Sequence, residues 1–361
     1  IPRSIKNLRF YAELAMSQNN KKFFQDNIES TVLRQPLGVV GTISPWNLPL
    51  YLFTWKIAPA LVSGNCVIAK PSEVTPYTAY LFSGACIKAG IPRGVINVLH
   101  GKGNNIGEKI VEHKKIKAIS FTGGTETGKK IALKASSNIK RISLEMGGKN
   151  PVLIFDDCNY KEMIESLVKS SFLNQGQICL SGSRIYIQDT IYEKFKKDFI
   201  SSVSKLNVGD PFNNATNQGA IVSYEHLNKI KKYVEHAINE GGDILYGGDQ
   251  PDIDGKCSSG WFFNPTIIEG LSQNSKLNKE EIFGPVVTLN KFTNEDEAIK
   301  MANDTDYGLA SIIWTQDTNR ADKLAEVLES GLVWINCWLE RDLRTPFGGI
   351  KDSGFGKEGG E

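Results

Sequence analysis

Residues 37–69 read LGVVGTISPWNLPLYLFTWKIAPALVSGNCVIA. In this stretch, two short apolar runs at 37–43 and 66–69 flank a longer apolar segment at 50–61. The short runs have the length of buried strands, and the longer segment has the length of a helix. Two strands joined by a helix lie parallel in one sheet, so this stretch predicts the beginning of an α/β domain.

The same alternation continues along the chain. Up to residue 144, helix-like and strand-like runs alternate at 79–89, 95–99, 106–111, 118–121, 129–135 and 142–144. A second series follows Pro151, with strand-like runs at 152–155, 184–187, 286–292, 309–314 and 332–335. Helix-like stretches separate these strands near 160–171, 190–204, 224–240, 294–303 and 317–329. The sequence therefore predicts an α/β protein with two parallel-sheet, Rossmann-like domains.

We place the boundary between the two domains at the Gly147-Gly148 turn. The first domain is predicted to comprise residues 1–17 and 36–147, and the second residues 148–361. The intervening residues 18–35 are polar and have no turn signal before a proline, so their composition predicts a loop or an edge strand. We expect a site that uses residues of both domains to lie in a cleft between them.

The overall composition excludes several classes of protein. With 361 residues and 40% hydrophobic content, the chain is long enough for two domains with cores of their own. The net charge of +2 is near balance, and no Lys/Arg cluster is long enough to predict binding to nucleic acid or to an anionic membrane. No apolar run reaches the roughly 18 residues of a membrane span.

The cysteines and histidines narrow the chemistry further. Six cysteines are scattered without CxxC spacing, which predicts reduced thiols in a reducing compartment such as the cytoplasm. The four histidines form no HExxH pair, and the chain has no GxSxG elbow. We therefore predict neither a metal site nor serine-hydrolase chemistry.

One cysteine, Cys179, lies in a setting that suits a nucleophile. It follows a helix-like segment and precedes a strand-like one, in a turn rich in Gly and Ser. Backbone N–H groups near a helix end stabilise a thiolate and provide donors for an oxyanion. Without this context, a cysteine is more often a small buried hydrophobe.

Two motifs resemble those of a known family. Residues 172–179, FLNQGQIC, resemble the catalytic-cysteine signature of the NAD(P)-dependent aldehyde dehydrogenases, and residues 144–151, LEMGGKNP, resemble their glutamate signature. The resemblance covers essentially all of the chain and implies an NAD-binding first domain and a catalytic second domain. The chain looks like the middle of such a protein without its two ends, because it has no initiating Met and stops in a Gly-rich turn.

The resemblance implies three catalytic residues, Cys179, Glu145 and Asn47. Asn47 lies in the family's Pro-Trp-Asn context, where its amide is an oxyanion donor; read alone, it is an N-cap. Glu145 ends a strand-like run, and desolvation there would raise its pKa toward that of a general base; read alone, it is a solvated charge or an N-cap. Together they predict thiolate attack on an aldehyde, hydride transfer to nicotinamide, and hydrolysis of the thioester by water that Glu145 activates.

A Gly-rich turn and a strand end are candidates for the cofactor pocket. Residues 121–128, FTGGTETG, lead from a strand through Gly123 and Gly124 into a helix whose first N–H groups suit a pyrophosphate. A plain strand-to-helix turn has the same pattern. Lys70 and Glu73 lie at the end of the second strand, where a carboxylate accepts ribose hydroxyls and repels a 2′-phosphate. This favours NAD over NADP, and a surface Lys–Glu pair is the alternative.

The resemblance adds detail to the cofactor site. It assigns the Lys70–Glu73 pair to the adenosine ribose, Trp46 to the pyrophosphate, and Glu281 with Phe283 to the nicotinamide side. Members of the family usually have Ser at the position of Gly124, so this chain lacks one hydroxyl contact. Backbone N–H donors remain available there.

Motifs near both ends of the chain bear on the substrate. Residues 346–349, PFGG, are general to the family and assign Phe347 to the substrate tunnel. Residues 336–344, NCWLERDLR, together with IPRS at the N-terminus and residues 45–52, look like the subgroup that oxidises 2-aminomuconate semialdehyde.

In that subgroup, two arginines grip a carboxylate of the substrate. By position, these are Arg3 and Arg341, and planar guanidinium groups suit carboxylates. Both are surface arginines in the alternative interpretation. Glu340 departs from the apolar residue expected beside Arg341 and would weaken an anion site if its side chain pointed inward.

The predicted function is NAD-dependent oxidation of a carboxylate-bearing semialdehyde of tryptophan or aromatic catabolism. A broad-range or betaine-type aldehyde dehydrogenase is the alternative among the enzymes, and a non-catalytic structural or binding relative that keeps the fold is the alternative of another functional class. By resemblance, residues 18–35 form a projecting hairpin that pairs subunits, so we expect a homo-oligomer.

Overall fold

The computed structural model describes residues 1–18 and 20–360. Residue 19, in the predicted hairpin, and residue 361, in the predicted second domain, lie outside the described part. Contacts divide the chain into two compact units. Unit 1 comprises Ile1–Glu145, Asp342–Pro346 and residues from 355 onward, and unit 2 comprises Met146–Arg341 and Phe347–Gly354. In the described residues, no helix is long and apolar enough to cross a membrane.

The sheet of unit 1 has the strand order of a dinucleotide-binding fold. From edge to edge the order is β17-β7-β6-β3-β4-β5. The five strands from β3 to β7 are parallel, and they are β3 (Val39–Ile43), β4 (Cys66–Lys70), β5 (Ile96–Val98), β6 (Ile116–Thr122) and β7 (Arg141–Glu145). The chain moves outward from β3 to β5 and then returns to β6 on the other side of β3. The strand order therefore reverses between β3 and β6, the position at which such sheets bind ligands.

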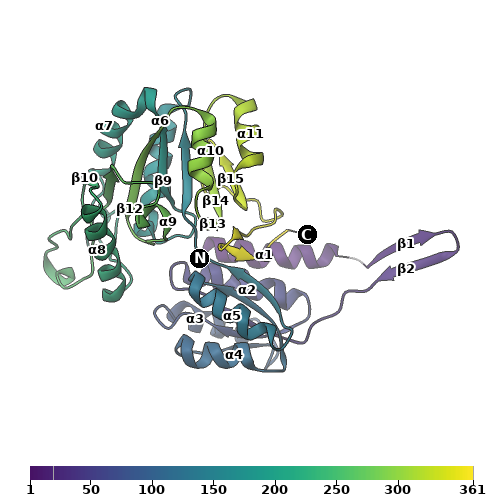
Figure 1. Ribbon diagram of the computed structural model, residues 1–361. Helices are drawn as coiled ribbons and strands as arrows, with labels where there is room; N and C mark the ends of the chain where they lie inside the picture. Colours follow the sequence, from purple (N-terminus) through teal and green to yellow (C-terminus); the bar gives the residue numbers. More distant parts are fainter. Residues whose placement is uncertain (19, 361) are drawn as a thin grey trace. The chain divides into compact units, whose positions relative to one another are not determined.

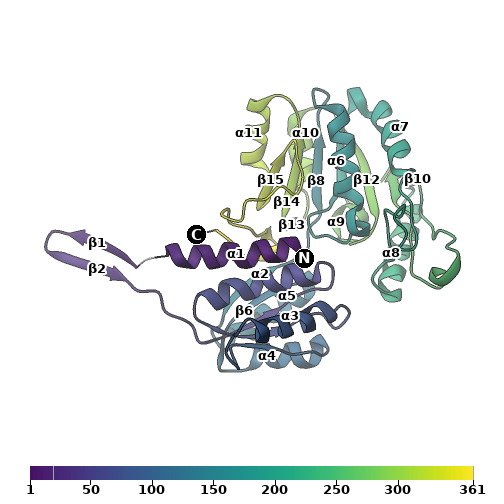
Figure 2. The ribbon, with the colours of Figure 1, turned by 180° about the vertical axis from the view of Figure 1, so that it is seen from behind.

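Helices cover both faces of this sheet (Figures 1 and 2). The helices α2 (Pro49–Val62) and α3 (Tyr77–Lys88) lie on one face, and α4 (Glu108–Glu112) and α5 (Thr125–Ser136) on the other. A π-helical turn, Gly103–Gly107, leads into α4. Gly41 of β3 permits the close approach of α4, because an added Cβ would lie 2.5 Å from Ile110 Cγ2.

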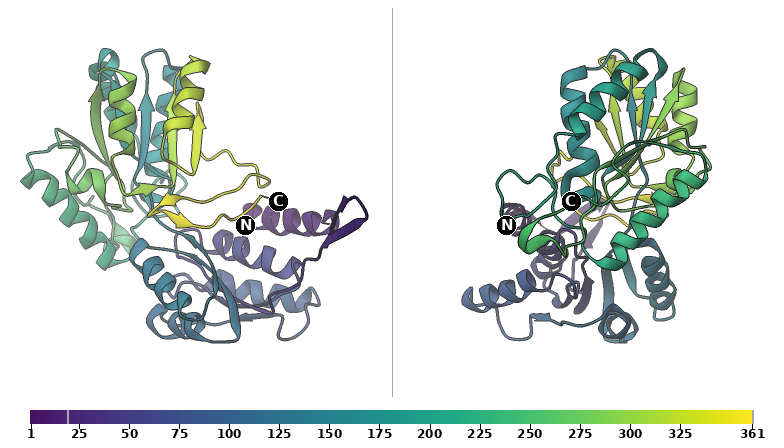
Figure 3. Two further views of the ribbon diagram at one scale, coloured as in Figure 1. Left: turned by 45° about the vertical axis from the view of Figure 1, so that its right-hand side comes forward. Right: turned by 90° about the vertical axis from the view of Figure 1, so that its left-hand side faces the viewer.

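The N-terminal helix and a hairpin complete unit 1. The helix α1 (Pro2–Ser17) packs on α2, with the ring centroids of Tyr11 and Trp55 5.5 Å apart. The strands β1 (Lys21–Gln25) and β2 (Ile28–Val32) form an antiparallel pair in which every residue is exposed. The hairpin follows α1 and stands clear of the sheet of unit 1 (Figures 1 and 3).

Unit 2 has a second, larger sheet in the order β10-β11-β12-β9-β8-β14-β15. The strands are β8 (Asn150–Ile154), β9 (Gly182–Gln188), β10 (Asp243–Tyr246), β11 (Thr266–Glu269), β12 (Val286–Phe292), β14 (Ala310–Trp314) and β15 (Leu332–Ile335). All neighbours pair in parallel except β10, which lies antiparallel at one edge. A short pair, β13 (Tyr307–Gly308) and β16 (Ile350–Lys351), lies outside this sheet.

Two layers of helices bury the second sheet. On one face lie α6 (Tyr160–Phe172) and α7 (Tyr192–Val203), and on the other lie α10 (Glu295–Asn303) and α11 (Thr318–Val327). In β8, Val152 and Ile154 belong to the core under α6 and α7, whereas Leu153 belongs to the core under α10 and α11. Because both faces are covered, the strands read as continuous apolar runs. The helices α8 (Tyr224–Asn239) and α9 (Lys276–Lys279) share a third core with β11 and β12.

The predicted α/β class with two Rossmann-like sheets is confirmed. The strands β10 and β11 are not among the predicted elements. For residues 18–35, composition leaves a loop or an edge strand open and the family resemblance predicts a hairpin; the structure has the β1–β2 hairpin there. Residues 342–346 and 355–360, assigned from sequence to the second domain, pack in unit 1. The functional labels of the domains and the pairing role of the hairpin stay predictions.

Candidate active site

The loop that carries Cys179 has an unusual backbone. After α6 ends at Phe172, a 3₁₀ turn contains three consecutive residues in the left-handed region, Asn174 (φ 54°), Gln175 (φ 57°) and Gly176 (φ 66°). Glycine adopts this conformation at no cost and asparagine at a small one, but glutamine is strained there. The turn delivers a half-buried Cys179 to the amino end of β9. The expected position between a helix and a strand is confirmed.

A buried asparagine fixes this loop to the sheet of unit 2. Asn150, the first residue of β8, donates from Nδ2 to the backbone oxygens of Cys179 (2.8 Å) and Ser181 (2.9 Å). Its Oδ1 accepts from the backbone N–H of Ala310 in β14, at 3.1 Å. The sequence analysis missed Asn150, although it belongs to the quoted 144–151 motif.

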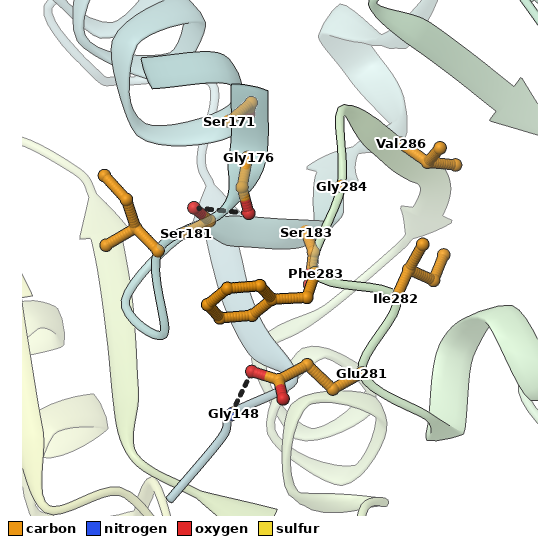
Figure 4. Close-up of a pocket in the computed structure, with 11 residues that line it drawn as sticks. Gly148, Ser171, Gly176, Ser181, Ser183, Glu281, Ile282, Phe283, Gly284 and Val286 are labelled. Carbon is orange, nitrogen blue, oxygen red and sulfur yellow. Dashed lines mark hydrogen bonds between the residues drawn. The ribbon is translucent and has the colours of Figure 1, made fainter. Parts of the chain in front are cut away.

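A second loop, residues 280–284, packs against the Cys179 loop. Figure 4 shows Glu281 and Phe283 on this loop, with the Glu281 carboxylate directed at Gly148. The backbone N–H of Gly148 donates to Glu281 Oε1 at 3.0 Å. An added Cβ on Gly176 would lie 2.3 Å from the backbone oxygen of Gly284, so the two loops are in close contact. A cavity of about 20 Å³, the size of one water molecule, lies between them.

Two fully buried groups beside these loops have strongly shifted pKa values. Burial raises the pKa of Glu281 to about 7, although the Gly148 hydrogen bond and the charges of Lys229 and Lys149 oppose the rise. Burial, with the charge of Arg184, lowers the pKa of Lys149 to about 7, and Glu281 opposes this change. Both groups therefore titrate near neutral pH.

The C-terminal segment of unit 2 holds two of the predicted substrate residues together. The guanidinium carbon of Arg341 lies 4.0 Å from the ring centroid of Phe347, in cation–π contact. Phe347 is buried in the same core as Ile178 and Leu180, which flank Cys179. Trp338 Nε1 donates to the backbone oxygen of Leu180 at 2.9 Å and ties this segment to the Cys179 loop. The sequence analysis did not assign Trp338.

The neighbouring Glu340 does not point into the interior. Glu340 is exposed, and its backbone oxygen accepts from Trp334 Nε1 at 2.8 Å. The departure from the expected apolar residue therefore places its charge in solvent.

In unit 1, Glu145 lies at the carboxyl end of β7, and Asn47 follows the carboxyl end of β3, with β6 between the two strands. Glu145 is the last residue of β7 and is only 5% exposed, so the solvated-charge interpretation is wrong. Its backbone oxygen accepts from the N–H of Gly123, at 3.1 Å. Asn47 is half-buried, and the N-cap of α2 is Leu48, so the N-cap interpretation of Asn47 is also wrong.

In the Lys70–Glu73 pair, the lysine is buried and the carboxylate is exposed. Lys70 is the last residue of β4 and is buried, and its Nζ lies 2.8 Å from Glu73 Oε2. The pKa of the Glu73 carboxyl is lowered, because hydrogen bonds from Lys70 and from the backbone outweigh the opposing effect of burial. Glu73 Oε1 accepts a long hydrogen bond, 3.4 Å from the N–H of Gly103, and the side chain is 44% exposed. An ionised acceptor thus faces solvent beside the sheet.

The point of strand reversal in unit 1 has unsatisfied donors. Ser44 follows β3, Thr122 ends β6 and Thr125 begins α5, and their buried hydroxyls have no hydrogen-bond partner in the described structure. The N-cap residue of α5 is Gly124, so no side chain caps this helix. Exposed N–H groups at a helix N-terminus and orphaned hydroxyls fit a pyrophosphate, so this edge of the sheet suits a dinucleotide.

The two glycines of that turn differ in their surroundings. An added Cβ on Gly123 would lie 2.5 Å from the ring of Phe121, so this position requires glycine. Nothing lies within 4 Å of an added Cβ on Gly124, which leaves the outer side of the turn open. Trp46, two residues after Ser44, is half-buried, and its backbone oxygen accepts from Thr75 Oγ1 at 3.3 Å.

The remaining predicted substrate residue, Arg3, is exposed on α1. Its guanidinium carbon lies 5.6 Å from the ring centroid of Tyr51 in α2. Across residues 1–18 and 20–360, no three His, Cys, Asp or Glu side chains are grouped as metal ligands.

Residues 1–361 match the family described as "Aldehyde dehydrogenase family". The chain belongs to this family. It is 46% identical to a mouse (Mus musculus) 2-aminomuconic semialdehyde dehydrogenase, over 99% of this chain and 74% of that protein. A 2-hydroxymuconic semialdehyde dehydrogenase of Pseudomonas putida is 41% identical, over 98% of this chain and 74% of the relative.

Solved structures of the family share the fold. Betaine aldehyde dehydrogenase from Staphylococcus aureus, crystallised in complex with NAD+, superposes with a TM-score of 0.95 at 39% identity, covering 99% of this chain and 72% of that one. The predicted family and the predicted class of aldehyde dehydrogenase are therefore confirmed. The roles of the individual residues stay predictions.

Proposed function

We propose that this protein oxidises an aldehyde to a carboxylic acid with NAD, through a thiohemiacetal and then a thioester on Cys179. The observation that carries the proposal is the Cys179 loop, in which a half-buried thiol follows a strained left-handed turn and is anchored by Asn150. Strained backbone persists where the surrounding structure holds it, and it is concentrated at reactive sites.

In this proposal, the Cys179 thiolate attacks the aldehyde carbon. The side-chain amide of Asn47 and the N–H of Cys179 donate to the oxyanion that forms. The hydride acceptor for the thiohemiacetal carbon would be supplied by bound NAD. Glu145 then takes a proton from a water molecule, which attacks the thioester and releases the acid and the free thiol. Aldehyde, water and NAD+ thus yield acid, NADH and a proton.

The cofactor is proposed to be NAD rather than NADP. The ionised, solvent-facing carboxylate of Glu73 accepts ribose hydroxyls and repels a 2′-phosphate, with Lys70 holding it in place. The Gly123-Gly124 turn at the start of α5 is assigned to the pyrophosphate, together with Trp46. Glu281 and Phe283 are assigned to the nicotinamide side.

The proposed substrate is 2-aminomuconate semialdehyde, a carboxylate-bearing semialdehyde of tryptophan catabolism. Relatives from mouse and human bear the name 2-aminomuconic semialdehyde dehydrogenase at 46% and 45% identity. Arg341, held over Phe347, is the proposed carboxylate ligand in unit 2, and Arg3 is the proposed ligand in unit 1. A betaine-type activity is the second candidate, because a betaine aldehyde dehydrogenase of Bacillus subtilis is 41% identical.

The assembly and location are also proposals. The β1–β2 hairpin exposes Phe23, Phe24 and Ile28, which favours a homo-oligomer in which these side chains are covered. None of the six cysteines forms a disulfide in the described residues, which favours the cytoplasm.

The substrate proposal is tested by Arg341→Ala. NADH formation is measured with 2-aminomuconate semialdehyde or its 2-hydroxy analogue and with an uncharged aldehyde. We expect kcat/KM to fall on the carboxylated substrate alone, by roughly the 2–5 kcal/mol of a severed charge pair. Arg344→Ala is the matched control, because Arg344 is exposed and pairs with Asp342. An equal loss on both substrates, or no loss, would overturn the carboxylate assignment and favour the betaine-type alternative.

A further inference from the structure

One face of α8 contacts the 280–284 loop. The side chains at positions 226, 229, 230 and 233 lie on one face of the helix, since residues three and four apart are neighbours. His226 Nε2 donates to the backbone oxygen of Phe283 at 2.7 Å, and Lys229 Nζ donates to that of Glu281 at 2.9 Å. Tyr233 donates from its hydroxyl to Glu280 Oε2 at 2.6 Å.

The fourth contact of this face is apolar. An added Cβ on Gly284 would lie 2.6 Å from Ile230 Cδ1, so the loop backbone lies directly on the helix. Four contacts from one helix face therefore hold a loop that has no regular secondary structure. Such a loop would otherwise be mobile, because few of its backbone groups are bonded within it.

The same region connects α8 to the Cys179 loop. Gln177 Oε1 accepts from the backbone N–H of Val222 at 3.0 Å, one residue before the N-cap of α8. On the other side, Gly176 packs on the backbone of Gly284, as Figure 4 shows for the two loop segments. The helix thus fixes the 280–284 loop and the nucleophile loop relative to each other.

His226 makes the most specific of these contacts. Phe283 has a φ of 61°, a left-handed conformation that is costly for an aromatic residue. The imidazole bonds to the carbonyl of this residue, and its ring lies edge-on to the Phe283 ring with centroids 6.2 Å apart. Burial and the charge of Lys229 lower the pKa of His226, although the Phe283 hydrogen bond opposes them, so the ring is neutral at pH 7 with its proton on Nε2.

We infer that His226 is a positioning residue, through which α8 holds Glu281 and Phe283 in the arrangement that binds the nicotinamide half of NAD. The inference rests on the proposed function, which assigns those two residues to the cofactor. It concerns a residue that touches neither the cofactor nor the reacting atoms. His226 acts through its hydrogen bond to the carbonyl of Phe283, a residue with a strained left-handed backbone.

The test compares His226→Leu with His226→Gln. Glutamine keeps an N–H donor at a similar distance from the helix, and leucine removes it. We expect the leucine variant to bind NAD roughly 3- to 10-fold more weakly by calorimetry, the loss of about one hydrogen bond. Its KM for NAD should rise by the same factor while kcat changes less. The glutamine variant should recover most of this affinity.

His236→Leu is the matched control on the same helix. His236 pairs with Glu240, the C-cap residue of the same helix, at 2.9 Å, so its ion pair lies within α8 and not at the 280–284 loop. The inference is overturned if His226→Leu binds NAD like the wild type, or if the glutamine variant is as impaired as the leucine variant. A wild type that binds NAD without oxidising any aldehyde overturns only the proposed function, and a wild type that does not bind NAD overturns both.

Discussion

At the scale of single residues, Asn150 is the anchor of the Cys179 loop. Its buried amide makes three hydrogen bonds, two of them to backbone oxygens on either side of the loop. Asn150→Ala leaves these oxygens without their donor. We expect the free energy of unfolding to fall by about 1–3 kcal/mol, the cost of an unsatisfied buried polar group. Urea denaturation measures this fall.

The same variant should also lower kcat, by more than the unfolded fraction of the protein accounts for. A displacement of about 1 Å at a nucleophile costs roughly 100-fold in rate, so kcat should fall well beyond what partial unfolding explains. Asn138→Ala is the control, because Asn138 is exposed and its side chain donates to the hydroxyl of the neighbouring Ser137. A stable Asn150→Ala protein with wild-type kcat would show that Asn150 does not position Cys179.

Two buried groups of opposite charge make stability depend on pH. The pKa of Glu281 is raised to about 7, so between its usual pKa and 7 the native state keeps a proton that the unfolded state has lost. Stability therefore falls as pH rises through this range. The pKa of Lys149 is lowered to about 7, so between 7 and its usual pKa the unfolded state holds the extra proton. Stability therefore rises with pH there, and the pair contributes a minimum near pH 7.

Glu281→Gln should remove the first slope and Lys149→Met the second. Each slope is at most about 1.4 kcal/mol per pH unit. The measurement is the free energy of unfolding in urea at about pH 5, 7 and 9, taken as the difference between each variant and the wild type. Glu326→Gln, an exposed carboxylate on α11, controls for loss of a charge. A Glu281→Gln protein with the wild-type change between pH 5 and 7 would contradict the assignment.

At the scale of elements, strong periodicity was enough to locate most helices and strands. The helix predicted at 224–240 is α8, Tyr224–Asn239, and its first residue follows a Ser223 cap that accepts from the N–H of His226. The strands β10 and β11 were not predicted, because each has four residues and no alternation of apolar and polar residues that distinguishes it from a loop. Short elements of this kind form only because a neighbouring strand supplies their hydrogen bonds.

The candidate site divides in the same way. Motif residues such as Cys179, Glu145 and Lys70 could be predicted from the sequence because each motif is a short contiguous stretch. The residues that hold the motifs were not, because their contacts join distant segments: Asn150 reaches across to Ala310, and His226 reaches across to Phe283. No local pattern encodes such a pairing, and only the folded chain brings the partners together.

The β1–β2 hairpin gives a prediction at this scale. An isolated two-stranded hairpin is marginal in water, and this one exposes Phe24 at 72% and Ile28 at 67%. Burial of these side chains in another subunit would stabilise both the hairpin and the assembly. We therefore expect Phe24→Asp to lower the molar mass measured by light scattering after gel filtration. Thr31→Asp on β2 adds the same charge without removing an apolar group, and an equal shift for both variants would argue against a specific contact.

At the scale of the whole chain, unit 1 is built from both ends of the sequence. Leu343 packs in a core with Tyr11 and Trp55, and β17 (Gly354–Phe355) joins the edge of the sheet beside β7. A boundary drawn once along the sequence, as at Gly147-Gly148, cannot represent a chain that leaves unit 1 and later returns to it. The return is decided by contacts between residues more than 200 positions apart, such as Ser143 with Glu358.

The most telling of these contacts is a buried ion pair. Lys56 Nζ of α2 lies 2.8 Å from Glu358 Oε1, its side chain is fully buried, and Ser120 Oγ donates to the same carboxylate oxygen at 2.6 Å. Glu358→Ala leaves the lysine charge buried and unpaired, so we expect unit 1 to lose about 3–5 kcal/mol of stability. Urea unfolding followed by fluorescence of Trp55, which lies beside Lys56 in α2, reports this loss. Replacing both partners, in Lys56→Met with Glu358→Leu, should restore most of it, because the desolvation cost disappears with the charge. If the double variant is as unstable as Glu358→Ala, the return of the chain stabilises unit 1 by its shape and not by this charge.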